Sequence, residues 1–154
     1  MTLRPGRRRA REFALQALYA ADIAGTAAPA ALAGLWSSQL DALGEGLDEP
    51  VGPEETEFAT ELVRGVMEQR EAIDARIEAA SEHWRLPRMP TVDRNILRLG
   101  TWELLQRPDI PASVTINEAI ELAKRFGGAE SRAFVNGLLD RVAGEVGRGG
   151  RRKK

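Results

Sequence analysis

The sequence contains no cysteine and a single histidine, His83. Without cysteine the chain has no disulfide, no thiol nucleophile and no cysteine-based metal site. With one histidine, beside Trp84, we expect neither a Ser-His-Asp triad nor a histidine metal cluster, and packing at a helix end is the favoured role for this pair. Neither GxGxxG nor a GxxxxGK[ST] phosphate loop occurs. We therefore predict a protein that is not an enzyme and uses no metal or cofactor.

Long apolar runs are also missing. No stretch approaches the about 18–20 apolar residues of a membrane span, and no apolar segment follows the N-terminal arginines as it would in a signal peptide. The lack of cysteine fits the reducing cytoplasm, so we expect a cytoplasmic protein with no membrane contact. Strand signals are absent as well, because β-branched runs are short and no Asn-Gly or Asp-Gly hairpin turn appears.

Helical periodicity covers most of the 154 residues, and 43% hydrophobic content is ample for a core. Thr91 is expected to cap one of the helices. Two groups of about three helices predict an all-α fold of two packed three-helix bundles, with subdomains of about 1–70 and 71–147 and a flexible basic tail over 148–154. The predicted helices are about 7–24 (ended by Gly25), 30–43, 53–80 with a break near 69–71, 91–106, 111–126 and 130–146, with an acidic loop over 44–52 and a linker over 85–90.

Charge is unevenly distributed along the chain. The total is 22 basic and 23 acidic residues, but residues 1–11 hold five arginines and residues 148–154 hold five basic residues. Residues 12–147 therefore carry 12 basic and 23 acidic side chains, a net charge of −11. This asymmetry suggests contact with a polyanion at one place and with a basic protein elsewhere, although solvated basic tails would give the same pattern.

The first helix has the most informative face. On a wheel of 100° per residue, Arg8, Arg11, Leu15 and Tyr19 lie together, opposite the apolar line that begins at Ala10. We expect guanidinium groups and an aromatic ring to face solvent there. Guanidinium with an aromatic ring is the chemistry of single-stranded RNA contact, since the charge binds phosphate and the ring stacks on bases.

Three later helices hold further signals. Glu103 lies inside the apolar arc of the 91–106 helix, where its carboxylate needs an arginine or backbone donors. The 111–126 helix predicts an outer face at Asn117, Glu118, Glu121, Lys124 and Arg125. In the last helix Phe134 lies at the rim of the apolar arc, favouring packing over stacking. Gly137 costs about 1 kcal/mol relative to alanine, which suggests close approach of another helix or a ligand.

The chain resembles the NusB family of bacterial transcription antitermination proteins. The resemblance extends over the chain in order, with residues 26–60 contributing little. It rests on Arg7-Arg8-Arg9-Ala10-Arg11-Glu12 with Gln16-Ala17-Leu18-Tyr19, on Val92-Asp93-Arg94 through Ile96-Leu97-Arg98 to Glu103-Leu104, on Ile116-Asn117-Glu118-Ala119-Ile120-Glu121-Leu122-Ala123-Lys124, and on Phe134-Val135-Asn136-Gly137-Leu138-Leu139-Asp140.

The resemblance implies binding of the boxA element in leader RNA of ribosomal RNA operons, together with the small-subunit ribosomal protein NusE. The pair would help tether nascent RNA to the RNA polymerase elongation complex with other Nus factors, suppressing termination. It also implies an acidic surface for NusE at Asp93, Glu118 and Glu121. The RNA-contacting residues would be Arg7, Arg8, Arg9, Arg11, Tyr19, Glu130, Arg132 and Phe134, with the Glu130 carboxylate modulating affinity rather than supplying it.

Two other classes of protein fit parts of the pattern. A similar helical module precedes the catalytic domain of certain ribosomal RNA cytosine methyltransferases, but this chain has no cysteine nucleophile and too few residues for that domain. A helical adaptor whose basic ends bind acidic protein would not distinguish a specific RNA from a scrambled one. A homodimer that covers the Tyr19 face is also open.

Overall fold

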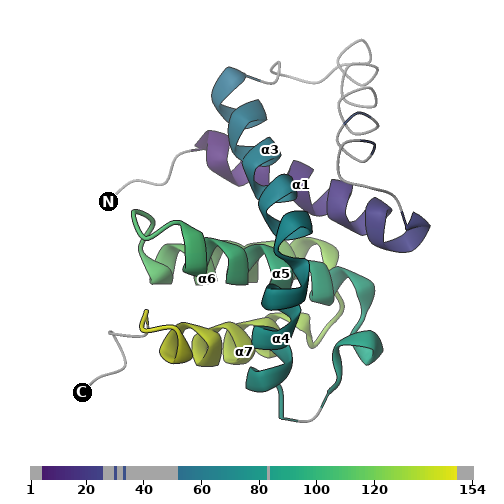
Figure 1. The fold of residues 1–154 in the computed structure, drawn as a ribbon, viewed down its shortest axis with the longest axis vertical. Helices are drawn as coiled ribbons and strands as arrows, with labels where there is room; N and C mark the ends of the chain where they lie inside the picture. Colours follow the sequence, from purple (N-terminus) through teal and green to yellow (C-terminus); the bar gives the residue numbers. More distant parts are fainter. Residues whose placement is uncertain (1–4, 26–29, 31–32, 34–51, 83, 149–154) are drawn as a thin grey trace. The chain divides into compact units, whose positions relative to one another are not determined.

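The computed structural model describes residues 5–25, 30, 33, 52–82 and 84–148. Within these ranges no strand occurs, and the all-α prediction is confirmed (Figure 1). The predicted helix over 30–43 and the acidic loop over 44–52 lie almost entirely outside them. The elements are α1 (Pro5–Ala24), α3 (Pro53–Glu68), α4 (Arg70–Ala80), the 3-10 turn η1 (Leu86–Arg88), α5 (Thr91–Gln106), α6 (Ala112–Phe126) and α7 (Ser131–Glu145).

The chain forms two compact units, Met1–Met67 and Glu68–Lys154. In the first unit, α1 ends as predicted at Gly25, whose φ of +70° favours glycine and whose amide donates to the Ala21 carbonyl. The acidic residues Glu54 and Glu55 occupy the first turn of α3, where the helix dipole favours negative charge. The predicted interruption is found at Gln69, between α3 and α4.

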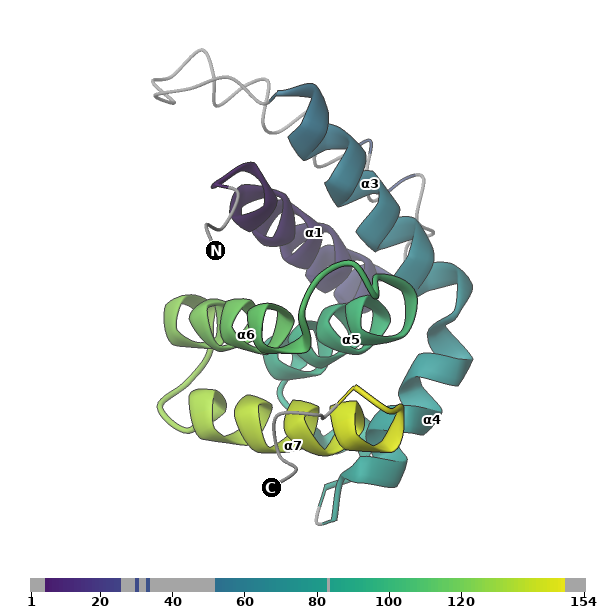
Figure 2. The same ribbon diagram turned by 90° about the vertical axis from the view of Figure 1, so that its left-hand side faces the viewer.

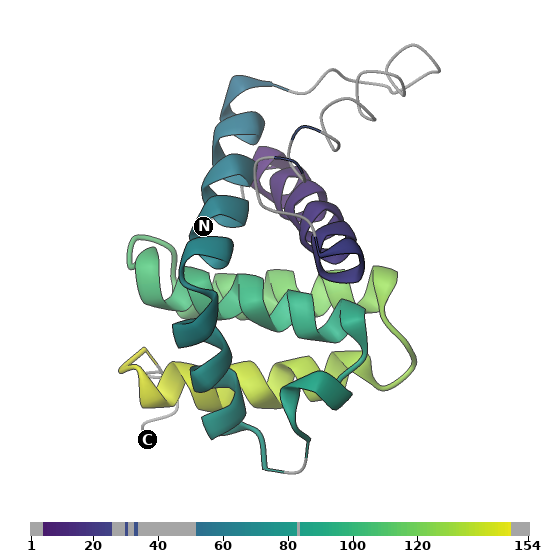
Figure 3. The ribbon, with the colours of Figure 1, turned by 45° about the vertical axis from the view of Figure 1, so that its right-hand side comes forward.

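The second unit is arranged around α5. Eleven of its 16 residues are buried, so this helix is covered on nearly all sides. Helices α5, α6 and α7 lie side by side, and α4 runs across α5 and α7 (Figures 2 and 3). The expectation that Thr91 caps α5 is wrong, because Pro90 occupies the N-cap and no side chain caps the helix.

Glycine allows close approach at two places in this unit. A Cβ on Gly100 of α5 would lie 2.7 Å from Leu139 Cδ1 of α7, so the missing side chain brings these helices together. A Cβ on Gly127 would lie 2.6 Å from Ser131 Cβ. At Gly137 a Cβ would meet no atom within 4 Å, so the expected close helix approach there is wrong.

Two buried charged side chains of α5, Glu103 and Arg98, are paired with residues of neighbouring helices. The Glu103 carboxylate, 1% exposed, accepts a hydrogen bond from Thr115 Oγ1 of α6 at 2.9 Å, so a threonine hydroxyl is among its partners rather than only arginine or backbone donors. Arg98 of α5 donates from Nε and Nη2 to the two oxygens of Asp74 of α4, at 2.9 and 3.1 Å. These bonds satisfy groups whose burial would otherwise destabilise the fold.

The prediction of a free basic tail from residue 148 is wrong at its first residue. Arg148 donates to the carbonyl oxygens of Leu104 and Ile110 at 2.7 and 2.6 Å, which attaches the chain after α7 to the turn between α5 and α6. Gly147, with φ of +81°, makes the bend that precedes it. Residues 149–154 lie outside the described part of the chain. Among the described helices none is long and apolar enough to cross a membrane.

Candidate nucleic-acid interface

Two arginines at the start of α1 lie against an aromatic ring of α3. The guanidinium carbons of Arg7 and Arg11 lie 5.2 and 5.4 Å from the centroid of the Phe58 ring. Arg7 and Arg11 are four residues apart and so share one side of α1. Both distances fall in the range of cation–π attraction, which fixes the two cations against the first unit.

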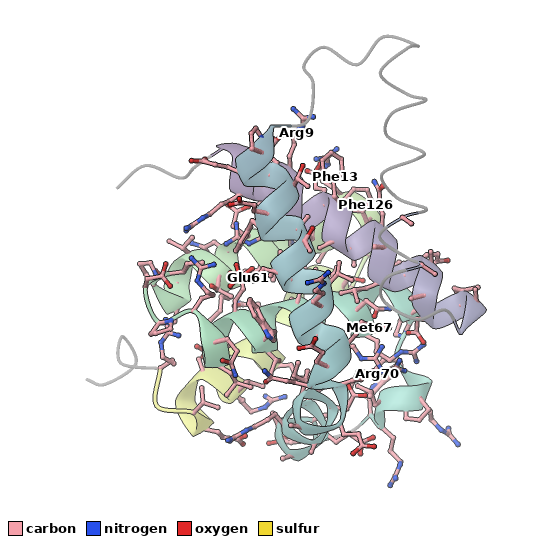
Figure 4. All side chains as sticks on the ribbon, turned by 45° about the horizontal axis from the view of Figure 1, so that its top comes forward. Arg9, Phe13, Glu61, Met67, Arg70 and Phe126 are labelled. Atoms are coloured by element: carbon pink, nitrogen blue, oxygen red, sulfur yellow. The ribbon has the colours of Figure 1, made fainter. Side chains whose placement is uncertain are left out.

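Arg9 is placed by different contacts (Figure 4). Its guanidinium lies 5.6 Å from the Phe13 ring centroid, and its Nε lies 3.5 Å from Oε2 of Glu55. The other Glu55 oxygen accepts a hydrogen bond from the Gly52 amide at 2.8 Å. Glu55 is itself buried. It pairs with the Arg9 guanidinium while the Arg9 side chain keeps 28% of its surface exposed.

The predicted solvent face of α1 is only half right. Arg8 and Tyr19 are exposed as expected, with 42% of Tyr19 accessible, but Arg11 and Leu15 are each 4% exposed. Arg11 is covered because it lies over Phe58. The exposed stripe runs instead through Arg8, Gln16, Tyr19 and Ile23, and Ile23 is 64% exposed.

The second group of predicted RNA-contacting residues lies at the start of α7, in the second unit. Glu130 stands at the N-cap of α7 without a side-chain capping bond, and both Glu130 and Arg132 are exposed. Phe134 is half-buried, and its ring centroid lies 6.0 Å from that of Trp84. Trp84 thus packs just after the end of α4, as expected, but it is 48% exposed and so less buried than is usual for tryptophan; His83 lies outside the described residues.

The residues predicted to meet a basic partner differ in accessibility. Asp93 is 4% exposed and accepts a hydrogen bond of 2.6 Å from Ser131 Oγ. Glu118 is 2% exposed, so its predicted position on the outer face of α6 is wrong. Of these three acidic residues only Glu121 keeps an accessible side chain, 39% exposed, with Lys124 Nζ 3.6 Å from its Oε2.

Sequence reasoning missed the roles of three residues, two in the surface of the first unit and one in that of the second. The buried Phe58 ring receives two guanidinium groups. The Glu55 carboxylate pairs with Arg9. Trp84 was assigned to packing from the usual burial of tryptophan. No local pattern marks these roles, because each depends on a residue distant in the sequence.

The described residues thus combine two cationic and aromatic surfaces, one in each unit, on an all-helical fold. The model of the NusB family matches residues 8–144. The chain is 49% identical over 138 residues to the transcription antitermination protein NusB of Sorangium cellulosum, covering 90% of this chain and 91% of that one.

Solved structures give the same result. A structure of NusB from T. maritima is 40% identical, covers 94% of each chain and superposes with a TM-score of 0.76. A crystal structure of the antitermination factors NusB and NusE in complex with dsRNA has a TM-score of 0.79 at 24% identity, covering 93% of this chain and 99% of that one, and shows a shared fold. The chain therefore belongs to the NusB family, as does the transcription antitermination protein of S. cellulosum.

Proposed function

We propose that this protein is a transcription antitermination factor that binds boxA RNA of ribosomal RNA operon leaders together with NusE. It acts in the cytoplasm with the RNA polymerase elongation complex and other Nus factors. Family membership supports the antitermination role. The observation that carries RNA binding is the exposed Tyr19 ring on the same stripe of α1 as the exposed Arg8, next to arginines fixed by Phe58 and Glu55.

In this proposal RNA is contacted by two separate surfaces, one in each unit. Arg7, Arg8 and Arg9 bind phosphate oxygens, and Tyr19 stacks on a base, a combination that suits single-stranded RNA. Arg11 is a positioning residue, because its side chain is buried and its guanidinium lies against the Phe58 ring. Arg132 and Phe134 contribute a cation and a ring from α7, and the exposed Glu130 carboxylate lowers affinity for phosphate.

The protein partner is proposed to meet the second unit at Glu121 of α6. Glu121 is accessible for direct contact with a basic ribosomal protein. Asp93 and Glu118 support that surface from within, Asp93 through its bond to Ser131 at the start of α7. Charge complementarity of this kind raises the association rate with a cationic partner.

The experiment is a fluorescence anisotropy titration of labelled boxA RNA against a scrambled RNA of the same length, at several salt concentrations. We expect tighter binding to boxA and a salt dependence that grows by about 0.7 in log–log slope for each phosphate neutralised. Equal affinity for both RNAs would contradict the proposal and would favour the alternative of a helical adaptor with basic ends.

A further inference from the structure

Trp84 is fixed in position without being buried. Ser81 Oγ donates to the Trp84 carbonyl at 2.6 Å and accepts from the Trp84 amide at 3.3 Å. Two residues later, the Leu86 amide donates to Oε2 of Glu78 at 2.9 Å. The backbone on both sides of Trp84 is therefore tied to the C-terminal part of α4. Nearly half of the residue nonetheless stays exposed, at 48%.

The exposed ring has an aromatic neighbour on α7. The rings of Trp84 and Phe134 have centroids 6.0 Å apart and planes tilted by 48°. This separation lies within the range of favourable aromatic pairs, so the contact orients the tryptophan ring. The pair forms a partly exposed aromatic surface in the second unit.

The same side of α7 continues through Gly137 and Arg141, three and seven residues after Phe134. A Cβ on Gly137 would meet no atom within 4 Å, and its φ is not positive. Neither packing nor backbone conformation therefore requires glycine there. Glycine is nevertheless the least favourable residue in a helix interior after proline, so its presence calls for another reason. Its effect is that no side chain projects from α7 at this half-buried position, one turn after Phe134.

Arg141 places a cation at the end of this side of α7, and a hydrogen bond holds that cation in position. Its Nε donates to the carbonyl of Ala80, the last residue of α4, at 2.8 Å. The residue is exposed. This bond holds the guanidinium at the surface, so little side-chain freedom remains to be lost when an anion binds.

We propose that Trp84, Phe134, Gly137 and Arg141 form one RNA-contacting strip in the second unit. An unpaired base stacks on the Trp84–Phe134 pair, the sugar–phosphate backbone passes over Gly137, and Arg141 binds a phosphate. This inference rests on the proposed function, since the ligand is the same single-stranded RNA. A ring pair next to a fixed guanidinium fits the flat bases and regular charge of RNA.

The first arm of the test measures the affinity for labelled boxA RNA by anisotropy. Because base stacking on an aromatic residue is lost, we expect Trp84→Ala to weaken binding by about 5- to 100-fold. Trp84→Phe keeps a ring and should retain most of the affinity. Gly137→Ala should lower affinity without lowering the unfolding midpoint, whereas Asn136→Ala, an exposed change on another face of α7, should leave affinity unchanged.

The second arm uses the fluorescence of the three tryptophans. Stacking of a base on Trp84 quenches its emission, so RNA should quench the unmodified protein more than Trp84→Phe. The difference between the two isolates Trp84 from the other two tryptophans and does not depend on stability.

The outcomes separate this inference from the proposed function. If the unmodified protein does not prefer boxA RNA, the proposed function fails and the strip fails with it. If the protein prefers boxA RNA but Trp84→Ala binds equally well and quenching is unaffected by Trp84→Phe, only the strip is overturned. If Trp84→Ala weakens binding of the NusE partner and leaves RNA affinity intact, the strip is a protein contact and the inference is wrong.

Discussion

Two neighbouring glycines have opposite surroundings, which makes them a matched test at the residue scale. A Cβ on Gly127 would lie 2.6 Å from Ser131 Cβ and 2.9 Å from the Ala123 carbonyl oxygen, while one on Gly128 meets nothing within 4 Å. We expect Gly127→Ala to lower the free energy of unfolding by about 1–3 kcal/mol through overpacking. Gly128→Ala should change it little. Urea denaturation measures both, and equal effects would contradict the described geometry.

Tyr19 gives the corresponding prediction for binding. Because the ring is exposed, Tyr19→Ala should leave helicity and the unfolding midpoint unchanged but weaken RNA binding by about 5- to 100-fold. Ile23→Ala is the control, since Ile23 is exposed one turn further along the same stripe and has no ring to stack. Circular dichroism measures the helicity and the unfolding midpoint, and fluorescence anisotropy measures the affinity for RNA. A loss of helicity in Tyr19→Ala would show that the ring is not free of the core.

At the scale of elements, the Arg98–Asp74 pair joins α5 to α4. Arg98 is 3% exposed, and it donates two hydrogen bonds to the Asp74 carboxylate. Asp74→Ala removes the carboxylate facing a buried guanidinium, so we expect a loss of about 3 kcal/mol or more in unfolding free energy.

Arg70→Ala is the matched control, because Arg70 also faces Asp74, but at 3.7 Å and with its side chain 42% exposed. An exposed pair of this kind contributes about 0–1 kcal/mol. Thermal or urea unfolding of the two variants should therefore differ clearly. Similar losses of unfolding free energy in the two variants would mean that burial of Arg98 does not determine how much its pairing with Asp74 stabilises the fold.

Arg148 stabilises the end of the second unit, and its substitution tests how much. Arg148→Ala removes two hydrogen bonds to the carbonyls of Leu104 and Ile110. We expect a loss of about 2 kcal/mol, since charged donors contribute more than neutral ones. Hydrogen exchange should rise in the turn between α5 and α6. Unchanged exchange there would show that residue 148 does not stabilise the turn.

The sequence predicted the bounds of the helices well, but it predicted less well which residues on each helix are buried. Apolar periodicity located α5, α6 and α7 to within a residue or two, because each helix has a clear apolar line and a stop signal. The same wheel left Leu15 and Glu118 in solvent, yet both are buried. A wheel shows where apolar residues lie on one helix, whereas burial depends on what is packed around it.

At the scale of the whole molecule, uneven charge and local motifs led to the proposed RNA-contacting residues, but they did not reveal how the surrounding side chains hold those residues in place. The arginine run and Tyr19 were visible in the sequence. The support from Phe58 and Glu55 was not, because it depends on α3 lying beside α1 within the first unit. The contact between Trp84 and Phe134 was also not visible, since Phe134 is 50 residues further along the chain.

The most direct test of joint RNA and protein recognition is the affinity for boxA RNA with and without NusE. Two ligands that bind cooperatively must each raise the affinity for the other. We predict that NusE strengthens binding of boxA RNA and does not strengthen binding of a scrambled RNA. A boxA affinity that is the same with and without NusE would contradict the account.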